Sequence, residues 1–117
     1  MIPWSAVSGI VIERSQLNDG WMTFEVQGEI DLATVGDLES AIDEVLADGE
    51  QGLVVDLNAS SFMDSTGLKA LVMADRRFSE AGRGFAVAIS SGPISRLIDL
   101  SGVRGSLRVV ESSADIH

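Results

Sequence analysis

The spacing of the hydrophobic residues changes along the chain, and each change predicts a different element. Residues 10–12 form a short β-branched run, which is typical of a strand. Further on, Met22, Phe24 and Val26 fall at every second position, which is the period of a half-buried strand. The turn-forming sequence of residues 18–20 (Asn-Asp-Gly) separates the two segments. We therefore expect the chain to begin with a hairpin.

From Leu32 onward the apolar residues take the spacing of an amphipathic helix. Thr34, with Asp37 three residues later, resembles a capping pair at its start. The Asp48–Gly49 pair predicts its end. The predicted apolar face of this helix is Val35, Leu38, Ile42, Val45 and Leu46.

Two short apolar runs, residues 53–57 and 85–89, predict buried strands. The segment between them has a helical apolar face and ends near Gly82, and Pro93 suits the first turn of a third helix. Residues 107–110 predict a last strand at the sheet edge. The predicted faces of the two helices are Leu68, Leu71, Val72 and Phe78, then Ile94, Leu97 and Ile98.

The resulting order of elements is β-β-α-β-α-β-α-β. Helices that alternate with strands favour right-handed crossovers and parallel pairing, and the first hairpin adds one antiparallel pair. We therefore expect an α/β sandwich with a mixed, mainly parallel sheet and the helices toward one face. With 117 residues, the chain has the size of one domain, so residues 1–117 are expected to share one core.

Composition and charge exclude several functions. The chain is 45% hydrophobic and has a formal charge of −10, whereas a nucleic-acid-binding module normally carries a basic surface. The same charge disfavours docking on an anionic membrane, and no apolar run approaches the about 20 residues of a membrane span. Residues 1–5 do not resemble a signal peptide, so the cytoplasm is the expected location. The chain has no Cys and a single His, at position 117, which disfavours metal sites and triad catalysis.

The negative charge is concentrated in the first half of the chain. Residues 1–58 contain twelve acidic residues and one basic residue, whereas residues 59–117 contain six acidic and seven basic residues. An acidic first half is explained either by solubility or by the steering of a basic protein partner. In the second case, association with that partner is sensitive to salt.

Candidate chemistry lies in residues 60–68, which join a buried strand to a helix. Loops at the carboxyl ends of parallel strands are where open α/β sheets bind their ligands. We expect Asp64 or Ser65 to cap the following helix, whose free N–H groups favour negative charge. A phosphate on Ser65 would find donors there. Ordinary helix capping explains the same residues, so both interpretations remain open at this point.

Enzymatic interpretations are less well supported. Lys69 follows Gly67 without a phosphate-binding loop, and no Gly-x-Ser-x-Gly motif is present. Asp56 ends a buried strand, as the phosphoacceptor of a response-regulator receiver does, but no acidic pair follows the first strand. We expect Asp56 to cap the next loop instead. Asp31 and Asp64 do not complete a hydrolytic or metal site, so we predict no enzymatic activity, no cofactor and no metal.

Four motifs lie along the chain in order. They are residues 28–31 (Gly-Glu-Ile-Asp), 53–57 (Leu-Val-Val-Asp-Leu), 62–68 (Phe-Met-Asp-Ser-Thr-Gly-Leu) and 97–103 (Leu-Ile-Asp-Leu-Ser-Gly-Val). In this order and spacing they resemble the STAS domain, and within it bacterial anti-sigma-factor antagonists. The resemblance extends from about residue 8 to residue 111, which is the expected core of a single domain.

The resemblance implies a role for each residue of the third motif. Ser65 is the implied phosphorylation site, with Thr66 as the alternative. Asp64 would orient the hydroxyl group or contact the partner, and Gly67 would let the partner approach the helix. The same comparison implies that Glu29 and Asp31 contact the partner beside the phosphorylation site. The partner-binding residues implied in this way are Glu29, Asp31, Asp64, Thr66 and Gly67.

The implied partner is an anti-sigma factor with a histidine-kinase-like ATPase fold. The unmodified chain would bind it and free a sigma factor for transcription, and phosphorylation of Ser65 would end the binding. ATP and magnesium would belong to the partner, and a serine phosphatase would reset the switch. A second interpretation is a STAS scaffold or transport-accessory module without a phosphorylation switch. One departure from the family concerns residues 111–117, which leave room for little more than one helical turn where a C-terminal helix is usual.

Overall fold

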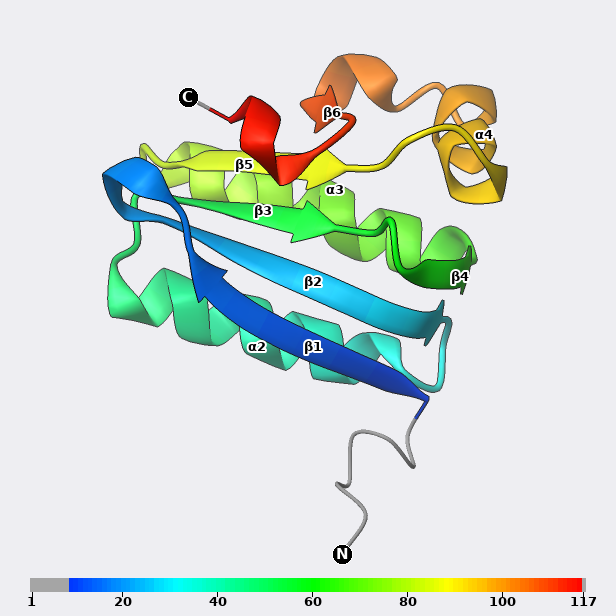
Figure 1. The fold of residues 1–117 in the computed structure, drawn as a ribbon, viewed down its shortest axis with the longest axis horizontal. Helices are drawn as coiled ribbons and strands as arrows, with labels where there is room; N and C mark the ends of the chain where they lie inside the picture. Colours follow the sequence, from blue (N-terminus) through cyan, green and yellow to red (C-terminus); the bar gives the residue numbers. More distant parts are fainter. Residues whose placement is uncertain (1–8, 117) are drawn as a thin grey trace, which may run out of the picture.

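The computed structural model describes residues 9–116, and the expectations for residues 1–8 and for His117 lie outside the described residues. One six-stranded sheet forms the centre of the molecule (Figure 1). The strand order is β1-β2-β3-β5-β6, and β4 pairs with β2 beyond the end of β3. The strands are β1 (Ile10–Gln16), β2 (Trp21–Ile30), β3 (Gly52–Asp56), β4 (Ser60–Met63), β5 (Gly84–Ala88) and β6 (Val109–Val110). Among the strands of residues 9–116, only β1 and β2 pair antiparallel, which confirms the mixed, mainly parallel sheet.

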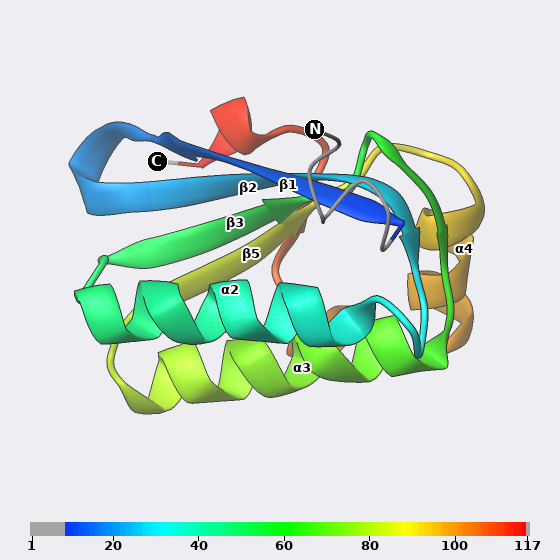
Figure 2. The same ribbon diagram turned by 90° about the horizontal axis from the view of Figure 1, so that it is seen from below.

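Two long helices cover one face of this sheet. They are α2 (Val35–Asp48) and α3 (Ser65–Glu80), which lie side by side with both N-termini at the same edge (Figure 2). The third helix, α4 (Pro93–Leu100), lies at that edge, next to β4. The helices thus lie toward one face, as predicted. Short 3-10 turns are η1 (Asn18–Gly20), η2 (Arg104–Ser106) and η3 (Ser113–Asp115).

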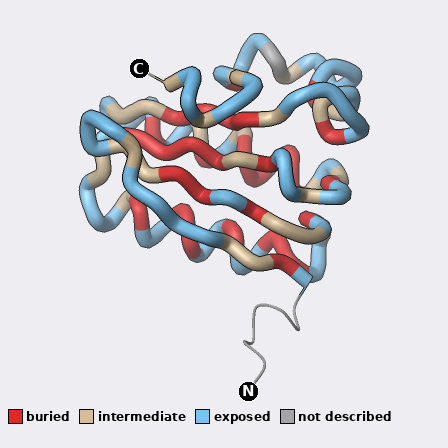
Figure 3. The backbone as a smooth tube through the Cα atoms, in the orientation of Figure 1, coloured by how far each residue is buried: buried red, intermediate tan, exposed pale blue. Residues whose placement is uncertain are grey.

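The predicted hydrophobic faces form the core. Alternate residues of the strands and the inner stripes of α2 and α3 are buried together (Figure 3). Leu38, Ile42 and Val45 of α2 are almost inaccessible to solvent, as are Leu71 and Phe78 of α3. Burial of a side chain of this size stabilises the fold by about 1.5–3 kcal/mol.

The opposite face of the sheet is partly covered as well. The indole of Trp21 lies across Gly52 of β3 and Gly84 of β5, and a Cβ atom on either glycine would overlap the ring. The C-terminal segment with η3 lies on this face, away from α2 and α3 (Figures 1 and 2). A capping box between Ser112 and Asp115 stabilises the start of η3. Residues 111–116 contain this one short turn, as their length predicts.

The strand β4 is absent from the predicted elements, in which residues 60–63 belong to a loop. It forms because β2 is longer than its neighbour β3, which pairs only with the first half of β2. The second half of β2 needs partners for its backbone groups, and Ser60, Phe62 and Met63 supply them. Four residues without clear alternation carry too little signal to predict a strand.

Candidate functional site

The candidate site lies at the edge of the sheet where β2 and β4 end and α3 begins. β4 runs parallel to β2, with Glu29 opposite Phe62 and Ile30 opposite Met63. The backbone N–H of Asp64 donates to the carbonyl oxygen of Ile30 at 3.1 Å. The fold therefore brings the first and third motifs side by side, although they lie more than thirty residues apart in sequence.

Asp64 is the N-cap of α3. Its Oδ1 atom accepts hydrogen bonds from the backbone N–H groups of Thr66 at 2.9 Å and Gly67 at 3.2 Å. Its own backbone is extended, as an N-cap residue requires. Of the two residues predicted to cap this helix, Asp64 is the N-cap, and Ser65 is the first helical residue.

Ser65 is exposed at the start of α3. Within residues 9–116 its hydroxyl group has no hydrogen-bond partner, so it is accessible to a second protein. Thr66 is half-buried. Of the two hydroxyl groups in the motif, that of Ser65 is therefore the easier to reach.

Two of the expected donors for a phosphate on Ser65 are already occupied. The N–H groups of Thr66 and Gly67 donate to the carboxylate of Asp64. A phosphate on Ser65 would have this carboxylate on the preceding residue, and like charges repel. The geometry therefore favours a phosphate that projects from the surface over one that binds the N–H groups of Thr66 and Gly67.

Asp31 and Glu29 lie beside this motif and differ in their exposure. Asp31 is half-buried, and its Oδ1 accepts from the N–H groups of Ala33 at 3.0 Å and Thr34 at 3.2 Å. The carboxylate of Asp31 thus shapes the turn between β2 and α2. Glu29 is exposed, and within residues 9–116 its side chain has no hydrogen bond or ion pair.

The predicted capping pair of Thr34 and Asp37 is wrong in its detail. Thr34 occupies the N-cap position of α2, but its hydroxyl does not bond the helix. The hydroxyl donates to the carbonyl oxygen of Glu29 at 2.8 Å and accepts from the N–H of Asp31 at 3.0 Å. Thr34 therefore ties the turn back to β2, and its side chain is buried.

Gly67 has an internal role that the sequence did not reveal. A Cβ atom at this position would lie 2.6 Å from Cγ of Met63 and 2.8 Å from Cγ2 of Ile30. The absence of a side chain lets the first turn of α3 pack directly on β2 and β4. Contact of Gly67 with a partner stays a prediction.

Exposed apolar side chains at this edge are not among the predicted site residues. Leu32 is 78% exposed, Phe62 46% and Leu100 81%. Phe62 and Leu100 border a cavity of about 300 Å³ between β4 and α4, which Leu97 also lines. Such residues are unfavourable in water, and a group of them often marks a protein–protein contact. Leu32 and Leu100 sit outside the predicted helix faces, which is the signal that could have identified them.

Asp56 has the structural role predicted for it. Its Oδ1 accepts from the backbone N–H of Asn58 at 2.9 Å and from the Asn58 side chain at 3.0 Å, which caps the loop after β3. In the described part of the chain, no three His, Cys, Asp or Glu side chains are grouped to hold a metal ion. No helix in that part combines the length and apolar character needed to cross a bilayer.

The fold and the site define a STAS domain. The family model of the STAS domain matches residues 14–116, and the chain belongs to this family. Among its relatives are anti-sigma-factor antagonists. It is 35% identical over 111 residues to the anti-sigma-F factor antagonist RsfB of Mycobacterium tuberculosis, which covers 95% of this chain and 89% of RsfB.

Solved structures agree with this assignment. An anti-sigma factor antagonist from Mycobacterium paratuberculosis superposes with a TM-score of 0.84 at 32% identity, covering 92% of this chain and 91% of that one. The Bacillus antagonist SpoIIAA shares the fold at 15% identity. Its unphosphorylated form gives a TM-score of 0.74 and covers 90% of this chain and 91% of SpoIIAA. Its phosphorylated form gives a TM-score of 0.68 and covers 90% of this chain and 95% of SpoIIAA.

Proposed function

We propose that the protein is an anti-sigma-factor antagonist that binds an anti-sigma factor when unphosphorylated and releases it when Ser65 is phosphorylated. The observation that carries this proposal is the exposed Ser65 hydroxyl at the first position of α3, beside the capping Asp64. Its relatives are named for the same activity. SpoIIAA has been solved in both phosphorylation states, so a member of this fold carries such a modification.

The partner supplies the chemistry of phosphorylation. An anti-sigma factor with a histidine-kinase-like ATPase fold would hold ATP and magnesium and transfer the γ-phosphoryl group to Ser65. A bond forms between Oγ and phosphorus, ADP leaves, and a base on the partner takes the hydroxyl proton. The chain itself needs no cofactor and acts as a cytoplasmic binding protein, not an enzyme. A separate serine phosphatase would restore the hydroxyl.

We take residues 1–117 as a single STAS domain with its core at about 8–111.

Electrostatic repulsion explains why the phosphate would end the binding. It adds about −1.5 to −2 charges at neutral pH. The carboxylate of Asp64 belongs to the residue directly before Ser65, and it already accepts from the N–H groups of Thr66 and Gly67. Glu29 and Asp31 belong to the end of β2 and the turn after it, at the same edge of the sheet. The new charge therefore adds to an edge that already carries acidic residues, with Lys69 one helical turn away, and it raises the cost of desolvating the interface.

The acidic first half of the chain supports a basic partner surface. The helix α2 alone contains five acidic residues and no basic ones, and its N-terminus lies at the same edge as Ser65. Opposite charges on two proteins accelerate their encounter, and salt screens this effect. The association rate should therefore fall as ionic strength rises.

The direct test is phosphorylation by the anti-sigma factors encoded in the same genome. Each is incubated with the protein and ATP, and the intact mass is measured. We expect the addition of one phosphate, lost in Ser65→Ala and retained in Thr66→Ala. A chain that binds an anti-sigma factor without gaining phosphate would support the STAS scaffold interpretation. Equal labelling of Ser65→Ala and the unmodified protein would overturn the assignment of Ser65.

A further inference from the structure

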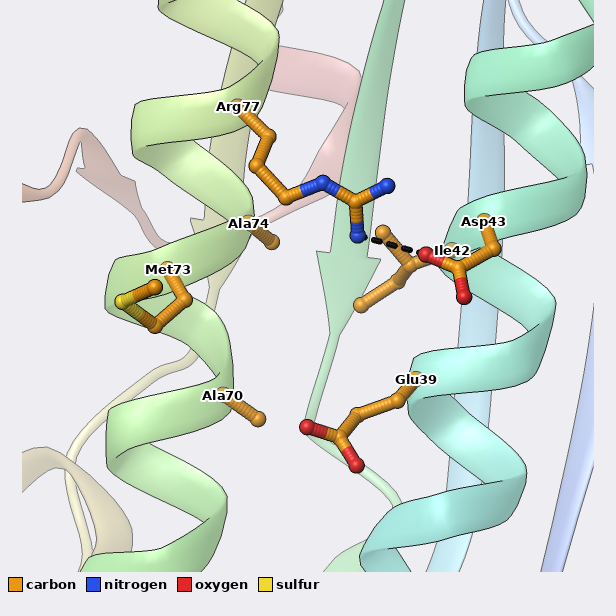
Figure 4. A pocket seen from close by; sticks show the side chains of 7 residues that line it. All are labelled: Glu39, Ile42, Asp43, Ala70, Met73, Ala74 and Arg77. Carbon is orange, nitrogen blue, oxygen red and sulfur yellow. Dashed lines mark hydrogen bonds and ion pairs between the residues drawn. The ribbon is translucent and has the colours of Figure 1, made fainter.

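A groove separates α2 and α3 on the surface that faces away from the sheet (Figure 4). Its volume is about 280 Å³. The groove reaches Glu39, in the second turn of α2, and Ala70, five residues after Ser65 on α3. At a rise of about 1.5 Å per residue, this end lies about 7.5 Å along the helix from Ser65. This end of the groove thus lies within two helical turns of the edge proposed to bind the anti-sigma factor.

The floor and one wall of the groove are apolar. Ile42 is 2% exposed, Ala74 3% and Ala70 7%, so the two helices meet over short or buried side chains. Met73 is 43% exposed on the α3 side and offers a flexible, polarisable surface. These groups can cover the hydrocarbon part of a long side chain.

The charges in the groove are unbalanced. Arg77 crosses it from α3 and forms an ion pair with Asp43 on α2 (Figure 4). The carboxylate of Glu39 points between the helices toward Ala70. Within residues 9–116, no basic group lies within ion-pair distance of Glu39. The groove therefore has one compensated pair and one uncompensated negative charge.

We propose that this groove accepts one lysine or arginine side chain of the anti-sigma factor. The cationic head would pair with Glu39, and the aliphatic stem would lie on Ala70 and Met73. Long basic side chains combine these two properties, since their stems are apolar and only their ends are charged. This contact rests on the proposed function and extends that interface from Ser65 along the acidic surface of α2.

The test compares charge variants inside and outside the groove. Binding of the anti-sigma factor that phosphorylates the wild-type chain is measured by calorimetry for the unphosphorylated protein. We expect Glu39→Gln to weaken binding about five- to tenfold and Glu39→Lys to weaken it further. Asp48→Asn is the matched control, because it removes one charge from the same helix outside the groove, and it should bind within about twofold of wild type. Thermal unfolding checks that each variant is folded.

A second measurement locates the contact. The methyl resonance of Met73, assigned from Met73→Leu in protein labelled with [13C-methyl]methionine, should shift when the anti-sigma factor is added. An unmoved Met73 resonance at saturation, or unchanged affinity of both Glu39 variants, would overturn the proposal. A self-association that Glu39→Lys abolishes would also overturn it, because a second copy would then occupy the groove.

Failure of the groove and failure of the switch give different results. If Ser65 phosphorylation leaves binding intact while Glu39→Lys weakens it, the proposed groove contact stands and the proposed phosphorylation switch is wrong. If phosphorylation ends binding while the Glu39 variants bind normally, the proposed switch stands and the proposed groove contact is wrong. If the wild-type chain binds no anti-sigma factor, both are wrong.

Discussion

Asp64 performs two tasks at one position. It caps α3 through the N–H groups of Thr66 and Gly67, and it places a carboxylate beside the hydroxyl proposed to receive a phosphate. A residue without a side-chain acceptor at this position would leave these donors free for the phosphate. At the scale of single residues, this arrangement would put the proposed phosphate at the surface, next to a carboxylate, where a partner can contact it.

The two residues of the motif should therefore differ in their effect on stability. Asp64→Ala removes the cap and is expected to lower the free energy of unfolding by about 1 kcal/mol. Ser65→Ala is the matched control, since its exposed hydroxyl makes no hydrogen bond within residues 9–116, and it should change stability by less than about 0.5 kcal/mol. Urea denaturation of both variants measures the difference. Equal stabilities would show that Asp64 does not cap the helix in solution.

We expect the free energy of unfolding to depend on pH through Asp75, which lies on α3. Burial raises the pKa of its carboxyl group above the ordinary value of 3.8. In the pH range from 3.8 up to the raised pKa, the folded state therefore binds more protons than the unfolded state. The stability that Asp75 contributes falls as pH rises through this window, and at neutral pH its charge is unfavourable.

Replacement by asparagine should relieve this cost. We expect Asp75→Asn to raise the melting temperature at pH 7, with a gain that shrinks as the pH is lowered toward 3.8. Thermal unfolding between pH 4.5 and 7.5 provides the measurement. Glu111→Gln, at an exposed carboxylate, is the control. A gain independent of pH would contradict the explanation by burial.

At the scale of elements, Asn58 joins three strand ends. Its Nδ2 group donates to the carbonyl oxygen of Glu111, after β6, at 3.1 Å. Its Oδ1 accepts from the backbone N–H of Ser90 at 2.8 Å and from the Ser90 hydroxyl at 2.9 Å, after β5. Asn58 itself follows β3 and precedes β4, so its amide connects the C-terminal segment to the strand that carries the phosphorylation motif.

Loss of this amide should loosen the edge strand β6 first. Asn58→Ala is expected to lower the free energy of unfolding by about 1–2 kcal/mol, because several partly exposed hydrogen bonds are lost together. Hydrogen exchange of Ile89, whose N–H donates to the carbonyl oxygen of Val110, should accelerate. Asn18→Ala, in the exposed first turn, is the control. Unchanged exchange at Ile89 would show that Asn58 does not hold β6.

The elements that the sequence predicted best are those with a strong hydrophobic pattern. The helix beginning at Val35 was predicted from its helical period and the signals at its two ends, and the buried strands β3 and β5 from their continuous apolar runs. The strand β4 was not, because its pairing depends on the length of β2 and not on its own residues. The hydroxyl of Thr34 was misassigned for a similar reason, since its partner Glu29 belongs to the preceding strand.

At the scale of the whole molecule, the parallel sheet explains why the two motifs of the candidate site lie at one edge. Parallel strands end at one edge, and the two motifs containing Asp31 and Asp64 each follow a strand of this sheet. The occupied donors around Asp64, the exposed side chains of Leu32 and Leu100 and the groove at Glu39 depend on the packing of separate elements. The pattern of residues along the sequence does not predict how separate elements pack against one another.

The central claim is that one phosphate on Ser65 ends binding to an anti-sigma factor. The most direct measurement compares the dissociation constants of the unmodified and Ser65-phosphorylated proteins for the same anti-sigma factor at the same ionic strength. We predict binding at least about tenfold weaker for the phosphorylated protein. Equal or tighter binding by the phosphorylated protein would contradict the account.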